Sequence, residues 1–305
     1  MSEQECIKCG KCNVKCPLYI ESREEKISPR GMLAVAEALE KGTFFPKEKV
    51  KDAFTACTFC RRCGEDCPVG IIPFERIADA LRRWGRVRRT LHRVSRRIIP
   101  AKGVETVILA GCTIERKEGL FADALKNLRL MIRNSVLARG YCCGAPFIRC
   151  GDFSLAAFAL ARIARFSCNA QQVITLCPRC AATLDESSRR FRIHIPQVRF
   201  MGELTRFEGQ KRRGRVFHFG GCVSEARGWA ERVRSCLRLS GLEVVYSEKI
   251  LCCGKGSKDI GDVLLNSLTD EYKKSGCELL LTDCPLCLDC FCRAGIKAKL
   301  SFLFL

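Results

Sequence analysis

Two runs of cysteines with identical spacing constrain this chain more than any other feature of its sequence. Each run has the pattern C-x2-C-x2-C-x3-C and is followed directly by proline. The first run consists of Cys6, Cys9, Cys12 and Cys16, and the second of Cys57, Cys60, Cys63 and Cys67. A loop with a thiolate at every third residue can wrap three corners of a cubic cluster, with backbone amides directed at the sulfurs. Both runs are therefore candidate metal-binding loops.

This spacing is typical of bacterial ferredoxins, in which each run binds a [4Fe–4S] cubane and supplies its fourth cysteine to the other cluster. We therefore expect two cubanes, one on Cys6, Cys9, Cys12 and Cys67 and the other on Cys57, Cys60, Cys63 and Cys16. A zinc site or a disulfide knot would be the alternative for a single run. Two complete runs argue against it. Between them, Met32, Val35, Ala36 and Leu39 recur at helical spacing, which predicts a helical two-cluster domain.

The rest of the chain contains a duplication marked by two Cys-Cys-Gly triplets. In both copies a lone cysteine precedes the triplet by the same interval, and a C-P-x-C motif follows it. The first copy has Cys112, Cys142, Cys143, Cys177 and Cys180, and the second has Cys222, Cys252, Cys253, Cys284 and Cys287. The offset between equivalent cysteines is constant up to the triplet and changes only slightly at the C-P-x-C motif. Five cysteines in the same order at nearly one offset indicate a duplicated unit of roughly 100 residues.

Each copy alternates strand-like and helical stretches. Strands are expected at 104–110 and 172–176 in the first copy and at 215–219 and 279–282 in the second, and helices before the triplets at 119–137 and 227–239. Such alternation predicts a parallel sheet, with the cysteines at the carboxyl ends of the strands, where open α/β sheets bind ligands. We therefore expect five thiols to converge in each copy. Cysteines that only pack in the core, or a zinc site in either copy, are the alternatives.

The composition of the chain limits the class of protein to which it can belong. The chain has 305 residues, of which 24 are cysteine and 47% are hydrophobic, enough for a folded core. The longest apolar stretches, such as 153–161 and 300–305, fall far short of the roughly 18 residues that span a bilayer. The first residues are polar and do not resemble a signal peptide, so we expect a cytoplasmic protein whose thiols stay reduced. The expected division is 1–98, 99–210 and 211–305.

The triplet modules resemble the cysteine-rich (CCG) domains of heterodisulfide reductases and related iron–sulfur oxidoreductases. The N-terminal part is similar to the two-cluster ferredoxin domain of that family, and the domain order is that of the D-type chain of heterodisulfide reductases. The motifs that carry the likeness are Cys6-Ile-Lys-Cys9-Gly-Lys-Cys12, Ser28-Pro29-Arg30-Gly31 and Cys67-Pro68-Val69-Gly70-Ile71. The resemblance implies a helical ferredoxin domain followed by two α/β CCG modules. Each module would hold a non-cubane [4Fe–4S] cluster on its five cysteines.

The same resemblance implies a catalytic iron–sulfur subunit. Electrons would move from the cubanes to one or two non-cubane clusters, where a disulfide of the CoM-S-S-CoB type is reduced. Whether both CCG clusters are catalytic, or one site holds zinc, stays open. His218, Lys255 and nearby arginines are candidates to orient an anionic disulfide. The chain departs from the family in having His218-Phe219-Gly220-Gly221 where His-Asp-Pro is frequent, and in its short segment after Cys284.

Two other functions use the same domains. One is an iron–sulfur subunit of a flavin-linked lactate, glycolate or glycerol-3-phosphate dehydrogenase that passes electrons to a quinone. The other is a non-catalytic electron carrier in a larger complex. The sequence contains no flavin or dinucleotide motif, so a flavin would belong to a partner. Expected partners are a cytochrome b, a flavoprotein, or a hydrogenase or dehydrogenase module, but not nucleic acid.

A basic segment and six further cysteines are not accounted for by these motifs. Residues 82–97 contain eight arginines with apolar residues interleaved, which predicts a solvated amphipathic helix, a docking surface or peripheral membrane contact. The formal charge of +20 falls to about +16 if each oxidised cubane carries about −2. The unassigned cysteines are Cys150, Cys168, Cys236, Cys277, Cys290 and Cys292. We expect them to pack, with Cys290 and Cys292 as alternative ligands beside the last C-P-x-C.

Overall fold

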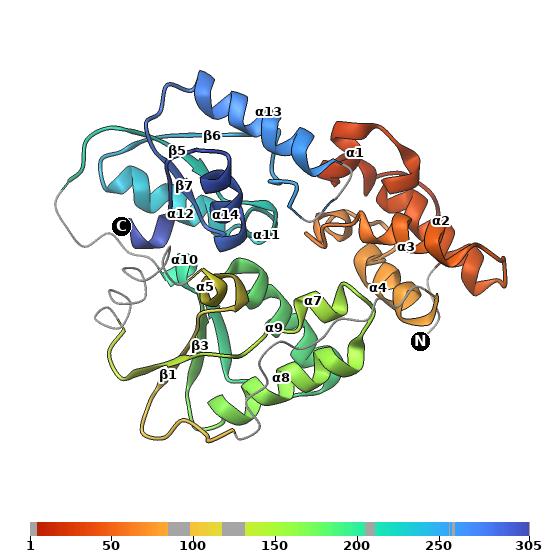
Figure 1. Ribbon diagram of the computed structural model, residues 1–305, viewed down its shortest axis with the longest axis horizontal. Helices are drawn as coiled ribbons and strands as arrows, with labels where there is room; N and C mark the ends of the chain where they lie inside the picture. Colours follow the sequence, from red (N-terminus) through yellow and green to blue (C-terminus); the bar gives the residue numbers. More distant parts are fainter. Residues whose placement is uncertain are drawn as a thin grey trace. The chain divides into compact units, whose positions relative to one another are not determined.

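The computed structural model describes residues 5–84, 98–117, 132–204, 211–255, 257 and 260–304 (Figure 1). The chain divides into two compact units. The first unit comprises Met1–Arg89, Pro146–Phe153 and Glu248–Asp270, and the second comprises Thr90–Ala145, Ser154–Ser247 and Glu271–Leu305. The first unit therefore includes the ferredoxin-like region together with a short segment from each duplicated copy. The boundaries expected at residues 98 and 210 stay predictions.

The ferredoxin-like region is helical, as the sequence predicts. Its elements are η1 (Asn13–Lys15), α1 (Pro17–Ser22), η2 (Glu25–Ile27), α2 (Pro29–Glu40), α3 (Lys47–Thr55), η3 (Arg62–Gly64) and α4 (Pro73–Trp84). In α2 the periodic residues Met32, Ala36 and Leu39 are buried, and this helix packs against α4. Arg82 and Arg83 form the last turn of α4. The rest of the basic segment, residues 85–97, lies outside the described residues.

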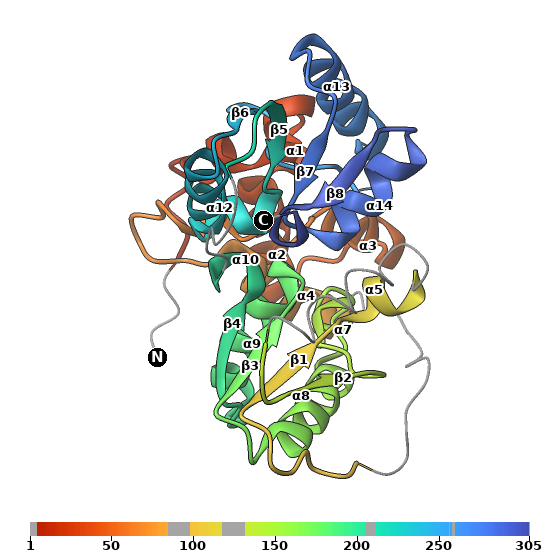
Figure 2. The same ribbon diagram turned by 90° about the vertical axis from the view of Figure 1, so that its left-hand side faces the viewer.

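The duplicated copies form two four-stranded sheets of identical topology. The strands are β1 (Thr106–Leu109), β2 (Ser135–Ala138), β3 (Gln172–Thr175), β4 (Gln197–Phe200), β5 (Arg215–Phe219), β6 (Glu243–Tyr246), β7 (Leu280–Thr282) and β8 (Ala298–Leu300). Their orders are β2-β1-β3-β4 and β6-β5-β7-β8, and every pairing is parallel. Figure 2 shows the first sheet with its strands side by side. The α/β fold class and the duplication are confirmed.

Helices follow the strands in both copies. They are α5 (Cys112–Arg116), α7 (Ala145–Ile148), α8 (Phe153–Ser167), α9 (Pro178–Phe191), α10 (Met201–Leu204), α11 (Cys222–Ala226), α12 (Trp229–Leu239), α13 (Gly261–Lys274), α14 (Pro285–Arg293) and η4 (Ser301–Leu303). The helix predicted at 227–239 corresponds to α12. The helix predicted at 119–137 is wrong at its end, because residues 135–138 form β2. Residues 118–131 lie outside the described part.

The sequence also missed the edge strands. Residues 135–138 and 243–246 are mostly only partly buried, so they lack the continuous apolar run of a central strand. Strands β4 and β8 were missed for the same reason. Although the segment after Cys284 is short, the second sheet still ends on a fourth strand and η4.

Central strand β1 is buried on both faces of its sheet. Val107 and Leu109 belong to one core cluster with Leu160 of α8 and Leu184 of α9. The alternate residues of β1 point to the opposite face, because side chains alternate along a strand. There Ile108 belongs to a second core cluster. Helices thus cover one face of the sheet and the second module covers part of the other.

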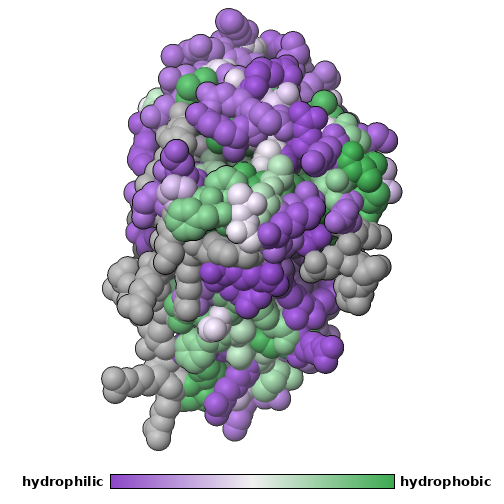
Figure 3. Space-filling view, turned by 90° about the vertical axis from the view of Figure 1, so that its right-hand side faces the viewer, coloured by the Kyte–Doolittle hydropathy of each residue, from purple (hydrophilic) through white to green (hydrophobic). Residues whose placement is uncertain are grey.

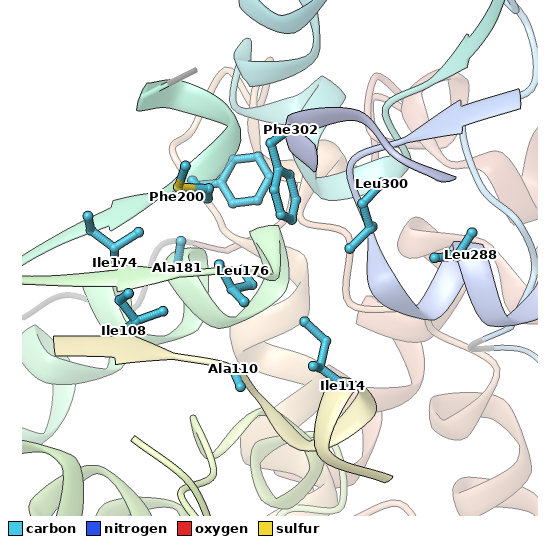
Figure 4. Close-up of a cluster of buried hydrophobic side chains, with 11 residues drawn as sticks. Ile108, Ala110, Ile114, Ile174, Leu176, Ala181, Phe200, Leu288, Leu300 and Phe302 are labelled. Carbon is cyan, nitrogen blue, oxygen red and sulfur yellow. The ribbon is translucent and has the colours of Figure 1, made fainter. Parts of the chain in front are cut away.

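That second cluster joins the two modules within the second unit. The first module contributes buried residues that include Ile108, Ile174 and Phe200. The second module contributes the buried residues Leu288, Leu300 and Phe302 (Figure 4). The rings of Phe200 and Phe302 meet edge to face with centroids 5.9 Å apart. Burial of aromatic and branched side chains makes this contact a continuous core rather than a polar docking surface.

The two modules contact each other through two equivalent pairs of helices. Helix α5 of the first module contacts α14 of the second, and α11 of the second contacts α9 of the first. Lys117 pairs with Asp289 at 3.3 Å, and Arg227 pairs with Asp185 at 3.6 Å and with Glu186. Lys117 and Arg227 are equivalent, because each caps the C-terminus of the helix that begins at the lone cysteine. Each module therefore packs its first-cysteine helix against the C-P-x-C helix of the other.

Within the described ranges, none of the helices combines the length and apolar character that crossing a membrane requires. Figure 3 shows one face of the molecule, on which hydrophobic residues form separate patches among hydrophilic ones.

Candidate metal centres

One cavity of the ferredoxin-like region is lined by cysteines from both runs. Cys6, Cys9 and Cys12 come from the first run and Cys67 from the second. Gly10 and Arg30 also line this cavity. The structure thus brings together the four cysteines that the crossed arrangement assigns to one cubane.

A second cavity is lined by the other four cysteines. Cys57, Cys60 and Cys63 come from the second run, and Cys16 comes from the first. Each cavity offers four thiols, which is the donor set of a cubane. The residues present therefore fit one [4Fe–4S] cluster in each cavity, and their individual ligand roles stay predictions.

Burial and repulsion between neighbouring thiols raise the pKa of three of these cysteines, Cys12, Cys16 and Cys63. Burial raises the pKa of Cys12 to about 11, and the neighbouring thiol of Cys6 adds to this rise. The pKa of Cys16 also rises to about 11, mainly through burial and further through Cys57. Burial and Cys60 raise the pKa of Cys63 well above its usual value. Cationic iron would offset both effects, because metal binding favours the thiolate.

The two loops share a backbone conformation that the sequence did not reveal. Lys8 and Phe59, at equivalent positions, have φ of 56° and 55°. Gly10 and Arg61, also equivalent, have φ of 78° and 75°. Left-handed residues between the cysteines turn the chain tightly. The guanidinium of Arg61 lies 4.4 Å from the centroid of Phe74, which supports a residue other than glycine at this strained position.

The Ser28-Pro29-Arg30-Gly31 motif has a physical explanation in α2. Ser28 caps the helix, accepting a hydrogen bond from the Gly31 amide at 2.9 Å, and Pro29 occupies the first helical position. A Cβ on Gly31 would lie 2.0 Å from the carbonyl oxygen of Glu25, so no side chain fits there. Arg30 bonds Glu25 at 2.7 Å and lines the first cavity. The motif therefore places one cation beside the proposed cluster.

In the first CCG module, parallel strands bring the cysteines to one edge. Cys112 follows β1, Cys142 and Cys143 follow β2, and Cys177 follows β3. Cys143 accepts hydrogen bonds from Cys142 and Cys180, which hold its pKa well below the usual range. Cys112 lies near enough for the charge on Cys143 to raise its pKa, after the larger effect of burial. All five cysteines predicted for this site are thus neighbours.

Both Cys-Cys-Gly triplets adopt the same turn. The amide of Gly144 donates to the sulfur of Cys142 at 3.5 Å, and the amide of Gly254 donates to that of Cys252 at 3.4 Å. The two glycines have φ of 86° and 71°. A Cβ on Gly144 would lie 2.7 Å from Leu160, within the core beneath the turn. The glycine is therefore needed for both backbone conformation and space.

In the second module, Cys222 follows β5 and Cys284 follows β7. A Cβ on Gly221 would lie 3.3 Å from the sulfur of Cys287, and one on Gly111 would lie 3.3 Å from that of Cys180. In both modules, the glycine before the lone cysteine thus lies close to the second cysteine of the C-P-x-C motif. Cys252 and Cys253 belong to the first compact unit. Their convergence with the other three cysteines of this copy stays a prediction.

The cysteine groups of the two modules meet at their C-P-x-C turns. Hydrogen bonds from Cys180 and from Cys284 hold the pKa of Cys177 well below its usual range. The guanidinium of Arg179, between Pro178 and Cys180, reaches the sulfur of Cys222 at 3.9 Å. Its charge also helps to lower the pKa of Cys143. Arg179 therefore lies between the two sites. The only signal for this in the sequence is that Arg179 stands inside the C-P-x-C motif.

In the described residues, no three His, Cys, Asp or Glu side chains converge on one point as ligands of a single metal ion would. Cluster ligands need not do so, because each thiolate of a cluster binds a different iron. All 24 cysteines are described, and none forms a disulfide.

The remaining candidates are spread over the fold. Cys150, Cys277 and Cys290 are buried, Cys236 is partly buried, and Cys168 and Cys292 are exposed. His218 is buried and bonded to Asp283, so it is not placed to touch a substrate from solvent. Lys255 is exposed.

Comparison with protein families gives matches over most of the chain. Residues 2–71 match the 4Fe-4S dicluster domain. Residues 106–185 and 216–291 each match the cysteine-rich (CCG) domain. The two CCG matches together cover just over half of the chain.

Among characterised and uncharacterised proteins, three similarities are informative. The chain is 25% identical to the B chain of fumarate reductase (CoM/CoB) from Methanothermobacter marburgensis, over 97% of this chain and 68% of that protein. It is 23% identical to an uncharacterized iron-sulfur protein of Methanocaldococcus jannaschii, over 92% of this chain and 66% of that protein. A 67-residue segment is 42% identical to a probable glycolate oxidase iron-sulfur subunit of Bacillus subtilis, covering 22% of this chain and 15% of that protein.

Proposed function

This chain belongs to the family of iron–sulfur proteins that join a 4Fe-4S dicluster domain to two CCG domains, and we propose that it is the disulfide-reducing subunit of an oxidoreductase. The observation that carries this proposal is the meeting of Cys177 and Cys284 at the contact between the two CCG modules. A disulfide has two sulfur atoms, and its reduction takes up two electrons and two protons and yields two thiols. Two adjoining cysteine-rich sites suit such a substrate.

When bound, the clusters would supply one-electron transfer and iron that can accept thiolate sulfur. Cys6, Cys9, Cys12 and Cys67 would hold one cubane, and Cys57, Cys60, Cys63 and Cys16 the other. The first CCG cluster would be held by Cys112, Cys142, Cys143, Cys177 and Cys180, and the second by Cys222, Cys252, Cys253, Cys284 and Cys287. The similarity to a CoM/CoB-linked fumarate reductase chain supports a disulfide or its thiols as substrate.

The chain's own residues would prepare this site in two ways. The glycine before each lone cysteine, Gly111 or Gly221, leaves room at the C-P-x-C sulfur for the closely packed ligand set. Arg179 places a fixed positive charge between the modules, where it would attract an anionic disulfide and stabilise developing thiolate charge. A guanidinium stays charged at all physiological pH values, so this effect does not depend on pH.

Anaerobic reconstitution followed by disulfide reduction tests the proposal. With a reduced viologen as electron donor, the loaded protein should convert a small anionic disulfide to thiols, and an added thiol should change the EPR spectrum of the oxidised protein. Cys177→Ser and Cys284→Ser should each abolish turnover while the cubane signals persist. Cys168→Ser, at an exposed cysteine outside the sites, is the matched control. Thiols that leave every signal unchanged would contradict the proposal.

A second candidate function rests on the 42% identity to a probable glycolate oxidase iron-sulfur subunit. In this function the chain would accept electrons from a flavoprotein partner and pass them on toward a quinone. This second function predicts that the partner reduces the clusters and that a quinone analogue reoxidises them. It also predicts that no EPR signal depends on added thiol. The same loaded protein therefore separates the two functions.

A further inference from the structure

A buried hydrogen-bond network lies where β5 and β7 end. The Nε2 atom of His218 is 3.0 Å from Oδ1 of Asp283, and the hydroxyl of Ser224 donates to Oδ2 at 2.5 Å. The exposed fractions of all three residues are 1% or less. Asp283 directly precedes Cys284, and Ser224 lies in the helix that begins at Cys222. The network therefore joins two of the segments that carry the proposed second CCG site.

The first module has no such network at the equivalent positions. When the two copies are aligned on their cysteines, His218 corresponds to Ile108, Ser224 to Ile114 and Asp283 to Leu176. Strand pairing supports this equivalence. His218 pairs with Leu281 in the second sheet, and Ile108 pairs with Ile174, the counterpart of Leu281, in the first. The three apolar counterparts all belong to one hydrophobic cluster. A duplicated unit thus has three core residues in one copy and three polar ones in the other.

Asp283 is hydrogen-bonded at both of its carboxyl oxygens in a position closed to solvent. Both of its oxygens are bonded, and the 2.5 Å contact with the Ser224 hydroxyl is in the range of O–H···O⁻ bonds to charged acceptors. Burying a charge costs several kcal/mol unless hydrogen bonds compensate it, whereas the apolar residues of the other copy carry no such cost. Nδ1 of His218 has no hydrogen-bond partner within the part of the chain described here. The second cysteine site therefore has a buried carboxylate beside it that the first site lacks at the equivalent position.

We propose that Asp283, held by His218 and Ser224, makes the two CCG sites electronically unequal by lowering the reduction potential of the cluster in the second module. The inference rests on the proposed function, because it needs a cluster in each module. A buried negative charge stabilises the oxidised form of an adjacent redox centre, and the low dielectric of the interior strengthens the effect. Arg179 near Cys222 acts in the opposite direction, so Asp283 and Arg179 together would set the potential.

Potentiometric titration followed by EPR tests this inference. Asp283→Asn keeps the shape of the side chain and removes its charge, so it should shift one CCG potential to more positive values. Ser224→Ala removes a donor that partly neutralises the carboxylate, so it should shift the same potential in the negative direction. A network that only supports the fold would not give opposite shifts. Glu243→Gln removes one carboxylate from the exposed start of β6, and this control should shift neither potential.

Two further variants assign the shift to a module. In a Cys180→Ala background, in which the first CCG site is disabled, the Asp283→Asn shift should remain. In a Cys287→Ala background it should vanish. Unchanged potentials in both Asp283→Asn and Ser224→Ala, with normal iron content, would overturn the inference and leave the proposed function intact. Wild-type protein that binds no iron beyond its two cubanes would overturn both.

Discussion

Cys177 and Cys284 contact each other through a thiol hydrogen bond, although they lie far apart in the chain. They are equivalent residues of the two duplicated modules, each the first cysteine of a C-P-x-C turn. The contact therefore lies where helices of the two modules pack against each other. It brings the first cysteine site next to the second.

Iron removal should make this pair oxidisable. In iron-free protein we expect an added small disulfide reagent to link Cys177 and Cys284. The lowered pKa of Cys177 supplies a thiolate that attacks the reagent and releases one of its thiols, and Cys284 then displaces the second thiol from the mixed disulfide. Peptide mapping under non-reducing conditions would detect the linked peptides. Cys284→Ser should abolish this product and Cys168→Ser should not. Disulfides only within one module, or equal yields in iron-loaded protein, would contradict the prediction.

The glycines before the lone cysteines should be required for iron. Gly221→Ala places a Cβ 3.3 Å from the sulfur of Cys287 at a φ of 80°. We expect a loss of about 1–2 kcal/mol in unfolding free energy from the left-handed backbone, and reduced iron content in the second module. Gly140→Ala is the control, since φ is 75° there but no atom lies within 4 Å of the added Cβ. Equal iron loss in both variants would show that backbone strain alone is responsible.

The ferredoxin-like region should depend on Gly31. Gly31→Ala would bring a Cβ to 2.0 Å from the backbone oxygen of Glu25, which cannot move without displacing the chain. Overpacking of this kind costs about 1–3 kcal/mol, which urea unfolding of the variant would measure. Gly64→Ala, whose added Cβ would meet only Ile72 at ordinary contact distance, should change stability by less than about 0.5 kcal/mol. Equal stabilities of these two variants would contradict the packing argument.

Arg179 should contribute to the use of an anionic disulfide. Arg179→Leu introduces the residue found at the equivalent position of the second module, Leu286. Loss of one charge-assisted hydrogen bond, about 1.5–3 kcal/mol, should lower kcat/KM by about 10- to 100-fold. Arg189→Leu, on the exposed side of the same helix, should have little effect. An uncharged disulfide that responds to Arg179→Leu as strongly as an anionic one would rule out the electrostatic role.

Much of the local structure could be predicted from the sequence. The spacing of Cys6, Cys9 and Cys12 specifies a short metal-binding loop, because ligands so close in the chain have few other geometries. The nearly constant offset between equivalent cysteines identified the duplication, and strand alternation placed Cys112 and Cys177 at the carboxyl ends of β1 and β3. Edge strands β2 and β6 were missed because their side chains are only partly buried, and tertiary pairing rather than an apolar pattern fixes them.

The sequence by itself determined which residues carry the chemistry and that the chain is built from two copies of one unit. Only the tertiary structure decided that Cys177 faces Cys284, that Arg179 of one module reaches Cys222 of the other, and that His218 is buried against Asp283. The physical reason is the range of the interactions involved. Motif spacing constrains atoms that are close together in the chain, whereas the contact between modules depends on surfaces assembled from distant parts of it.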